Sequence, residues 1–420
     1  MFDYDKWQEI FSTIRKNKLR TALTMFGIFW GIFMILILTG TGNGLKEGVM
    51  NGFKGWSTNA GFIWTSRTTK PYNGFKARRK FAFDIKDVDI LREQVDGIEL
   101  IVGRYENWSV GGKNAVVFRD NSAAIKVQGE YPDYLFIESV NVNRGRFINK
   151  HDFDQWRKVA VIGKEAQKLL FSSGVDPIGK YVKFRGSNFK VVGIYESLRE
   201  DERAKDQEKR MIIPASTFRV VMNRGDKLNR ISYTARKGVS VQSVEDGIKR
   251  VLRERHQIHP EDQKAVGGWN FQKEVSKIDN LFNGISALVL FVGLGTLMAG
   301  IIGISNILLI VVRERTKEIG IRKSIGATPS AIIGLIMQES IFITAIAGYL
   351  GLFFGLGIIE LLRVGLEVSG AETGMFKNPN IEPKTALVWL FSLLIAGVLA
   401  GIMPAIKATR INPIEALRKE

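Results

Sequence analysis

The sequence predicts a membrane protein with a transmembrane bundle of four α-helices and a large mixed α+β extracytoplasmic domain between helices 1 and 2. A helix needs about 20 apolar residues to cross a hydrocarbon core. Four segments reach this length, and a long polar block at residues 43–279 separates the first two. The apolar segments are residues 21–41, 281–312, 331–359 and 385–406.

These segments and the charges at their ends predict an order of regions along the chain. The first and second membrane helices are predicted to continue outward as a stalk, through residues 44–53 and 271–279. The predicted regions are a cytoplasmic interfacial amphipathic helix (1–18), helix 1 (19–45), an extracytoplasmic domain (46–280), helix 2 (281–312), a cytoplasmic hairpin (313–328), helix 3 (329–362), a short outer loop (363–383), helix 4 (384–406) and a cytoplasmic tail (407–420).

The N-terminal arm has the pattern of a helix that lies at the membrane surface. Apolar residues recur at helical spacing at Trp7, Ile10, Phe11 and Ile14, with polar residues between them. A helix docked on its own protein is the alternative. The following apolar run is longer than a signal-peptide core and has no small-residue cleavage site, which favours a retained anchor.

Charge predicts orientation and location. Basic residues concentrate in the N-terminal arm, the 313–323 turn and the C-terminal tail, so these segments and both termini are predicted to be cytoplasmic. The net charge of +18 is spread along the chain without a basic helix, which argues against nucleic acid and favours contact with membrane lipid. The absence of cysteine excludes disulfides and thiolate chemistry.

The outer block shows both strand and helix patterns. A segment dense in both charges, residues 196–210, predicts a mobile loop. Helical periodicity predicts helices at residues 85–95, 164–171 and 241–254. Alternating or β-branched runs predict strands at residues 115–118, 124–127, 158–162, 181–184, 189–194, 211–214 and 231–235.

Small residues predict close helix packing within the membrane. Two glycines four positions apart let two helix backbones approach, and such pairs occur in three of the four membrane segments. They suggest a tightly packed bundle or a dimer. The pairs are Gly27 and Gly31, Gly351 and Gly355, and Gly397 and Gly401.

Patterns that resemble catalytic or ligand sites have structural explanations. Residues 174–180 fit G-x-x-x-x-G-K, but Tyr181 stands where a P-loop needs Ser or Thr, and a strand follows instead of a helix. This segment is predicted to be a turn into a β-hairpin. His256 and His259 are predicted to lie in a solvated turn. We therefore expect no enzyme, no metal site and no cofactor bound by this chain.

One acidic residue, Glu339, lies inside the third apolar segment. Acidic groups at membrane depth are candidates for function because burying them is costly. The alternative is that Glu339 pairs with another group or reaches the cytoplasmic surface, two to three turns from the helix end. We favour this second interpretation.

The hairpin at residues 313–327 places a charged segment between two apolar ones. Gly320 and Gly326 are predicted to break the helix, and Thr328 and Pro329 to start the next one. A charged ring around aliphatic side chains suits docking into a groove on a soluble partner. The residues predicted to make this contact are Arg313, Glu314, Arg315, Glu318, Ile319, Gly320, Ile321, Arg322 and Gly326.

These features resemble the MacB/FtsX-like family of ABC transporter permeases. Residues 315–327 are similar to the family's ERTxEIGIRKAIGA motif, and the resemblance runs from end to end. The other matching segments are residues 17–28, 338–340, 401–405 and 412–418 in the membrane part, and residues 161–163, 176–180 and 192–194 in the outer block.

The resemblance implies that the 313–327 turn is the coupling helix, which docks on an ATPase. It implies a porter-like outer domain with an inserted Sabre-like subdomain at about residues 129–225. It also implies a dimer with a second permease copy, identical or different, and a separate ATPase subunit that binds ATP and magnesium. A periplasmic adaptor is a further expected partner.

In the family, ATP-driven closure moves the periplasmic domain, which is called mechanotransmission. The expected function is export or extrusion of an antibiotic, peptide, lipid or lipoprotein. The alternative is an FtsX-like regulator that activates a cell-wall hydrolase. The sequence leaves the substrate, the periplasmic partner and the type of dimer open.

Overall fold

The computed structural model describes all of the chain except residues 1–17, 108–110, 173, 370–375, 414–415 and 417–420. The predicted interfacial helix at residues 1–18 thus falls almost entirely outside the described residues. The chain divides into two compact units, each with its own hydrophobic core. We call Val49–Asp279 the outer unit, and Met1–Gly48 with Asn280–Glu420 the membrane unit.

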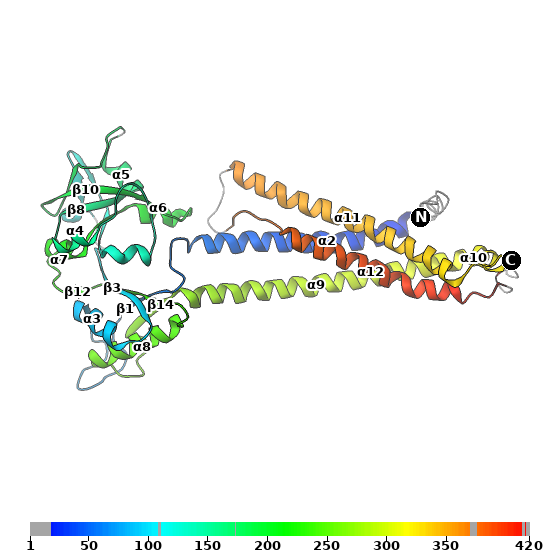
Figure 1. The fold of residues 1–420 in the computed structure, drawn as a ribbon, viewed down its shortest axis with the longest axis horizontal. Helices are drawn as coiled ribbons and strands as arrows, with labels where there is room; N and C mark the ends of the chain where they lie inside the picture. Colours follow the sequence, from blue (N-terminus) through cyan, green and yellow to red (C-terminus); the bar gives the residue numbers. More distant parts are fainter. Residues whose placement is uncertain (1–17, 108–110, 173, 370–375, 414–415, 417–420) are drawn as a thin grey trace. The chain divides into compact units, whose positions relative to one another are not determined.

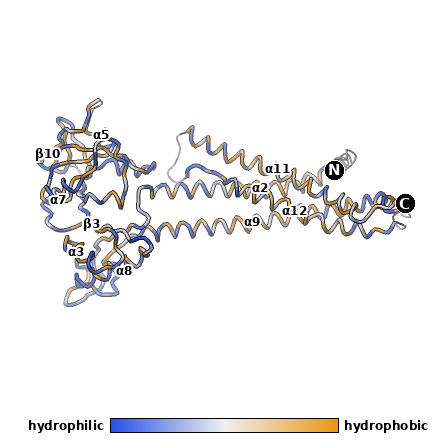
Figure 2. The backbone as a smooth tube through the Cα atoms, viewed as in Figure 1, coloured by the Kyte–Doolittle hydropathy of each residue, from blue (hydrophilic) through white to orange (hydrophobic). Residues whose placement is uncertain are grey.

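Four helices in the described residues are long and apolar enough to cross a membrane, which confirms the predicted helical membrane class. Their hydrophobic colouring is visible along α2, α9, α11 and α12 in Figure 2. A short helix, α10, connects α9 to α11 (Figure 1). The helices are α2 (Lys18–Asn51), α9 (Phe271–Glu314), α10 (Thr316–Ser324), α11 (Pro329–Ser369) and α12 (Pro383–Thr409).

Three of these helices extend beyond the apolar segments. α2 continues to Asn51 and α9 begins at Phe271, as the stalk extensions predict. α11 continues to Ser369, beyond the predicted end at residue 362. Arg363 pairs with Glu360 one turn earlier, and such pairs stabilise exposed helix.

The outer unit is built on a mixed sheet of 12 strands, in the order β14-β1-β13-β3-β6-β11-β8-β10-β9-β4-β5, with β7 beside β10. A small second sheet pairs β12 with β2. The strands are β1 (Ala60–Thr65), β2 (Phe83–Asp84), β3 (Ile98–Glu106), β4 (Val116–Phe118), β5 (Asn121–Ala123), β6 (Lys126–Glu130), β7 (Asn141–Gly145), β8 (Val159–Gly163), β9 (Tyr181–Phe184), β10 (Ser187–Glu196), β11 (Arg210–Pro214), β12 (Lys227–Leu228), β13 (Arg230–Ala235) and β14 (Val266–Asn270).

Short helices cover this sheet. In α8 the apolar side chains Val244, Ile248 and Leu252 face the core, as helical spacing predicts. The outer-unit helices are α3 (Ile85–Gln94), α4 (Lys150–Asp154), α5 (Lys164–Leu170), α6 (Glu202–Glu208), α7 (Ala215–Val221) and α8 (Val241–Arg255), with two 3₁₀ turns, η1 (Gly112–Asn114) and η2 (Pro132–Phe136).

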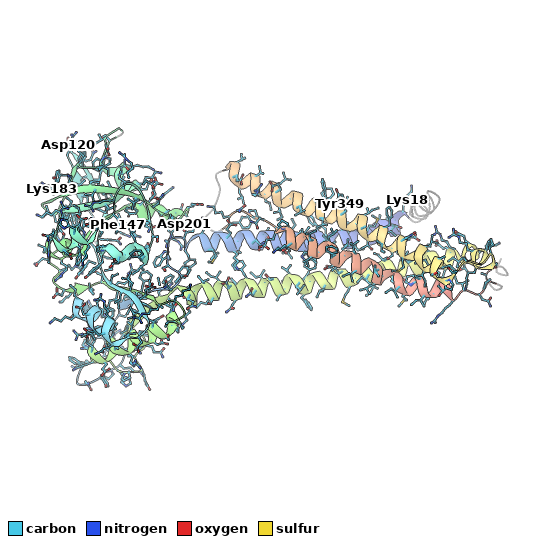
Figure 3. The ribbon with its side chains drawn as sticks, viewed as in Figure 1. Lys18, Asp120, Phe147, Lys183, Asp201 and Tyr349 are labelled. Atoms are coloured by element: carbon cyan, nitrogen blue, oxygen red, sulfur yellow. The ribbon has the colours of Figure 1, made fainter. Side chains whose placement is uncertain are left out.

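The sheet consists of two strand groups. The first group is β14, β1, β13 and β3, and the second runs from β6 to β5. In the described residues, the ladder between β3 and β6 consists of two residue pairs, Tyr105 with Gly129 and Glu106 with Gln128. Figure 3 labels two residues of the second group, Asp120 at the β4–β5 turn and Lys183 on β9. The inserted subdomain was predicted to begin at about residue 129. Because β4 pairs with β9, the second group includes residues that precede this position.

All seven predicted strands and all three predicted helices of the outer block are present. The predicted mobile loop at residues 196–210 is wrong in its centre, which forms α6. Asp201 caps this helix by accepting a hydrogen bond from the Ala204 amide. Ala204 and Gln207 are buried, so the charged segment is anchored on one side.

Candidate coupling site

The predicted contact segment forms the short helix α10 between two membrane helices. α9 ends at Glu314, and α10 begins at Thr316, whose hydroxyl donates to the backbone carbonyl groups of Val312 and Arg313. Arg315 has a non-helical backbone and separates the two helices. The predicted break at Gly320 is therefore wrong, because this glycine lies inside α10.

The end of α10 follows from Gly326, which has a φ of +100°. The amide of Gly326 donates to the Lys323 carbonyl group, and the amide of Ala327 donates to that of Arg322. This pair of bonds is a Schellman motif, which terminates helices where a glycine adopts a left-handed conformation. The Thr328 hydroxyl then accepts from the Ala331 amide at the start of α11, as predicted from Thr328 and Pro329.

One side of α10 is attached to the other helices of the membrane unit. Ile319 and Gly320 are buried, and a Cβ added to Gly320 would lie 2.6 Å from that of Ala416. The Lys323 ammonium group donates to the carbonyl groups of Thr409 and Ile411, at 2.8 and 2.7 Å. A cation is favourable at this position because the last carbonyl groups of α12 carry partial negative charge.

A buried ion pair connects the beginning of α10 to α11. Arg315 lies 3.9 Å from Glu339, whose side chain is 4% exposed. Pairing of Glu339 near the end of its helix agrees with the interpretation that we favoured from the sequence. The same arginine lies 3.9 Å from Glu318 of α10.

The opposite side of α10 is exposed. Ile321 is 43% exposed and Ile325 is 82% exposed, and the two lie four residues apart on one face. Arg313 and Glu314 at the end of α9 and Lys317 of α10 are also exposed. An apolar centre surrounded by charged groups has the character of a contact surface for another protein.

The structure brings the predicted contact residues together but sorts them by side. Ile319 and Gly320 lie on the attached side of α10 and Ile321 on its exposed side, whereas Arg313 and Glu314 are exposed at the end of α9. Glu318 and Arg322 pair with each other at 2.8 Å and are about 40% exposed. Their role in a contact stays a prediction.

Sequence reasoning missed three members of this site. Ile325 follows Ile321 by four residues, so helical spacing was a signal that it shares the exposed face. Lys317 is exposed within the same charged segment. Lys323 caps the end of α12, and its partner Thr409 is 86 residues away in sequence.

Five of the six predicted packing glycines lie where another helix approaches. Gly351 and Gly355 face Ile32 and Leu36 of α2. Gly31 faces Thr296 of α9. Added Cβ atoms at these three positions would lie 2.8 or 2.9 Å from the nearest atom.

The remaining two glycines of that set, Gly397 and Gly401 of α12, lie against Thr344 and Ser340 of α11. The Ser340 hydroxyl donates to the Gly397 carbonyl group at 2.6 Å, so a polar bond accompanies the close approach. An added Cβ at Gly27 would meet no described atom within 4 Å.

The P-loop-like turn leads into a β-hairpin, as predicted. Gly174 and Gly179 both have positive φ, and the Gly179 amide donates to the Val191 carbonyl group. β9 follows directly and pairs with β10. The surroundings are thus those of a structural turn.

The prediction of a solvated turn at His256 is wrong. The His256 Nε2 atom lies 3.0 Å from both carboxylate oxygens of Asp87, and the imidazole packs beside Phe81 and Phe83. Burial alone would raise the pKa of Asp87, but the hydrogen bonds from His256, the Asp84 amide and Arg255 together outweigh it, so the pKa lies below its usual value.

A second group of charged side chains lies inside the outer unit, around Arg104 of β3. The Arg104 Nε group pairs with Glu130, and its Nη2 atom lies 3.3 Å from Glu138. The Tyr134 hydroxyl donates to Glu138, and the guanidinium group lies 4.2 Å from the centre of the Tyr134 ring. These residues come from both sides of the junction between the strand groups.

Burial and nearby charge shift the pKa values of Glu130 and Glu138 in opposite directions. Burial raises the pKa of Glu130 to about 7, although Arg104 opposes this effect. At Glu138 burial also raises the pKa, but the charge of Arg104, the Tyr134 hydrogen bond and the charges of Arg210 and Arg230 together outweigh it, so the pKa lies below its usual value. Glu138 is therefore the ionised partner of Arg104 at neutral pH.

Two family models together span most of the chain. A model described as MacB-like periplasmic core domain matches residues 21–251, and one described as FtsX-like permease C-terminal matches residues 290–413. The first match alone includes more than half of the chain. The chain belongs to the MacB/FtsX-like family of ABC transporter permeases.

Individual relatives match over nearly the whole chain. The macrolide export ATP-binding/permease protein MacB of Bdellovibrio bacteriovorus is 27% identical over 413 residues, which cover 98% of this chain and 61% of the relative. The pyoverdine export ATP-binding/permease protein PvdT of Pseudomonas putida is 29% identical over 405 residues, covering 96% and 58%. The chain thus spans about three fifths of the length of these curated relatives.

Among solved structures, the periplasmic region of MacB from Actinobacillus actinomycetemcomitans matches with a TM-score of 0.43 and 23% identity. The match covers 54% of this chain and 96% of that structure.

Proposed function

We propose that this chain is the membrane subunit of an ABC exporter, in which a separate ATPase chain binds ATP and magnesium and docks on α10. The outer unit then moves in response to ATP binding and hydrolysis. Family membership supports the transporter class, and the two-sided construction of α10 supports the docking site.

The observation that carries the proposal is the exposed pair Ile321 and Ile325 on a helix whose other side is fixed. An ATPase that binds the exposed face pulls on Lys323, which holds α12, and on Arg315, which pairs with α11. Force on one short helix therefore acts on several membrane helices at once.

A continuous helix offers a route for this movement. α9 has 44 residues, and at 1.5 Å per residue it is about 66 Å long. Its first residue, Phe271, is 5% exposed and contacts the rings of Phe53 and Trp269 inside the outer unit. We propose that displacement of Glu314 is transmitted along α9 to this aromatic group.

The proposed cargo is a periplasmic or membrane-associated compound such as an antibiotic, peptide, lipid or lipoprotein. This proposal is supported by the names of two relatives, which refer to macrolide export and to pyoverdine export. We place the protein in a bacterial inner membrane with both termini in the cytoplasm, and we expect a periplasmic adaptor as a partner.

The proposed assembly contains a second permease copy beside α9. The apolar 18-residue stretch of α9 is 22% buried, whereas that of α11 is 33% buried, so α9 offers much uncovered apolar surface. Cysteines introduced at Phe291 and Met298, which are 79% and 61% exposed, should form crosslinks between copies. Surrounding lipid covers the remaining apolar surface.

The decisive experiment is Ile325→Asp in the full chain. A charge at this position should abolish co-purification with the ATPase and stimulation of its hydrolysis, because the apolar centre of the contact is lost. Ser330→Asp is the matched control, since it adds the same charge at the start of α11, where helices favour acidic groups. Normal ATPase binding by the Ile325 variant would contradict the proposed docking site.

A further inference from the structure

The outer unit contains a polar cavity of about 200 Å³ at the junction of its two strand groups. It is lined by residues of both groups, including Trp56 and two acidic residues, Glu106 and Glu138. Basic side chains predominate in its wall, and they are Arg104, Lys126, Arg199, Arg210 and Arg230. The cavity is thus positively charged.

The acids in this wall are already engaged. Glu138 pairs with Arg104, and Glu106 pairs with Arg230. Glu130 lies behind the wall and also pairs with Arg104. These pairs use the negative charges beside the cavity and leave an excess of positive charge at its opening.

Arg199 is a basic residue of this wall whose charge is not balanced by a close carboxylate in any described segment. Its guanidinium group lies 5.4 Å from the centre of the Trp56 ring, and no salt bridge to a carboxylate is found for it among the described residues. Burial lowers the pKa of Arg199, which is the effect expected of a cation removed from water without a close counter-ion. A bound anion would supply that counter-charge.

Unpartnered donors point to the same conclusion. The Nε group of Arg199, the Nε group of Arg230 and the indole Nε1 group of Trp56 are buried and have no hydrogen-bond partner in the described part of the chain. All three residues line this cavity. Leaving a buried donor without a partner is unfavourable, so acceptor atoms are expected in the cavity.

We propose that this cavity binds a small oxyanion, a carboxylate or phosphate group, between the two strand groups of the outer unit. Arginine suits this ligand because its planar donors match carboxylate and phosphate oxygens. A volume of about 200 Å³ is below the range of about 300–1,000 Å³ for drug-sized ligands, so the cavity takes a small ion or one acidic group of a larger molecule.

A bound oxyanion would join residues that the sheet itself barely connects. Arg210 lies on β11 of the second strand group, Arg199 follows β10 of the same group, and Arg230 lies on β13 of the first. In the described residues, two residue pairs form the ladder between β3 and β6. Binding therefore stabilises one relative arrangement of the two groups. This inference goes beyond the proposed transport function and does not depend on the ATPase.

The test uses the full chain in lipid nanodiscs, titrated with inorganic phosphate and separately with citrate at constant ionic strength. Isothermal calorimetry measures binding, and tryptophan fluorescence reports on Trp56, with Trp56→Phe as its reference. We expect saturable binding of at least one anion, and the two titrations show whether phosphate or carboxylate is preferred.

Arg199→Gln should weaken this binding at least tenfold and should raise the unfolding temperature in anion-free buffer, because an uncompensated cation is removed. Arg210→Gln provides a second variant of the cavity. The control is Arg203→Gln, since Arg203 lies on the adjacent helix and is 71% exposed. Binding that is not saturable, or that falls equally in the Arg199 and Arg203 variants, would overturn the proposal.

Discussion

The membrane unit and the outer unit use opposite means to pack. In the membrane unit, glycines such as Gly351 and Gly355 let helices approach until an added Cβ would meet a neighbour at about 3 Å. In the outer unit, large side chains such as Tyr105, Phe189 and Phe218 fill the interior and are fully buried. Both units are closely packed, the membrane unit through small residues and the outer unit through large ones.

The difference follows from the solvent of each unit. Between membrane helices lipid is as apolar as leucine, so association relies on close contact and on polar bonds such as that of Ser340 to Gly397. In water, burial of apolar area drives folding, at about 25 cal/mol per Å². The outer unit can therefore also enclose a costly charged group around Arg104.

The largest expected effect comes from Arg104→Met in the outer unit. This change leaves Glu130 and Glu138 buried without their cation, which typically costs about 3–5 kcal/mol. The free energy of unfolding, from urea titration followed by tryptophan fluorescence, measures the loss. Arg144→Met is the control, because Arg144 is 52% exposed and its pair with Asp176 should contribute under about 1 kcal/mol. Equal losses in both variants would refute the distinction.

A change to the membrane unit should cost somewhat less. Gly355→Leu places a side chain where a Cβ would already lie 2.8 Å from Leu36, and overpacking costs about 1–3 kcal/mol. Gly357→Leu on the same helix meets no described atom within 4 Å and should be tolerated. Thermal unfolding in detergent compares the two, and a similar melting temperature for both would show that close helix contact is unimportant.

A pH-dependent effect is expected at His256. Loss of its hydrogen bond to the Asp87 carboxylate in His256→Ala should cost about 1.5–3 kcal/mol at neutral pH. The pKa of Asp87 is lowered in the folded state, so this stabilisation is present above the unfolded pKa of about 3.9 and is lost as the pH falls through the folded value.

The unfolding free energies of the wild type and the His256 variant should therefore converge in acid. His151→Ala serves as the control, since His151 is exposed on α4. A difference that stays constant between pH 7 and pH 3 would mean that the ionised form of Asp87 is not the partner of His256.

Much of the fold follows from local sequence patterns. β8 has a continuous apolar run, β13 alternates polar and apolar residues, and α8 has clear helical spacing, so each was predicted. β14 contains Gly267 and Gly268 and has no such pattern. β3 ends in Arg104 and Glu106, whose charges hid a buried strand because their partners come from other segments.

The coupling site was predicted in position but only partly in its orientation. The charged motif identified α10, and Thr328 with Pro329 identified the start of α11. Two contacts decide which side of α10 is fixed. Lys323 donates to a carbonyl group at the end of α12, and Arg315 pairs with Glu339, which is 24 residues further along the chain. Such contacts between distant segments leave no periodic signal in a sequence.

The smallest expected effect concerns the surface pair Glu318 and Arg322 of α10. Their side chains are 42% and 39% exposed, and exposed pairs four residues apart on a helix contribute about 0.3–0.5 kcal/mol. Glu318→Gln should lower the unfolding temperature of the isolated chain only slightly, and added salt should remove the difference. Glu318→Lys should weaken ATPase binding, because it reverses a charge at the edge of the exposed isoleucine face. A large loss of stability in the isolated chain would instead mean that Glu318 serves the fold, through Arg315, more than it serves the contact.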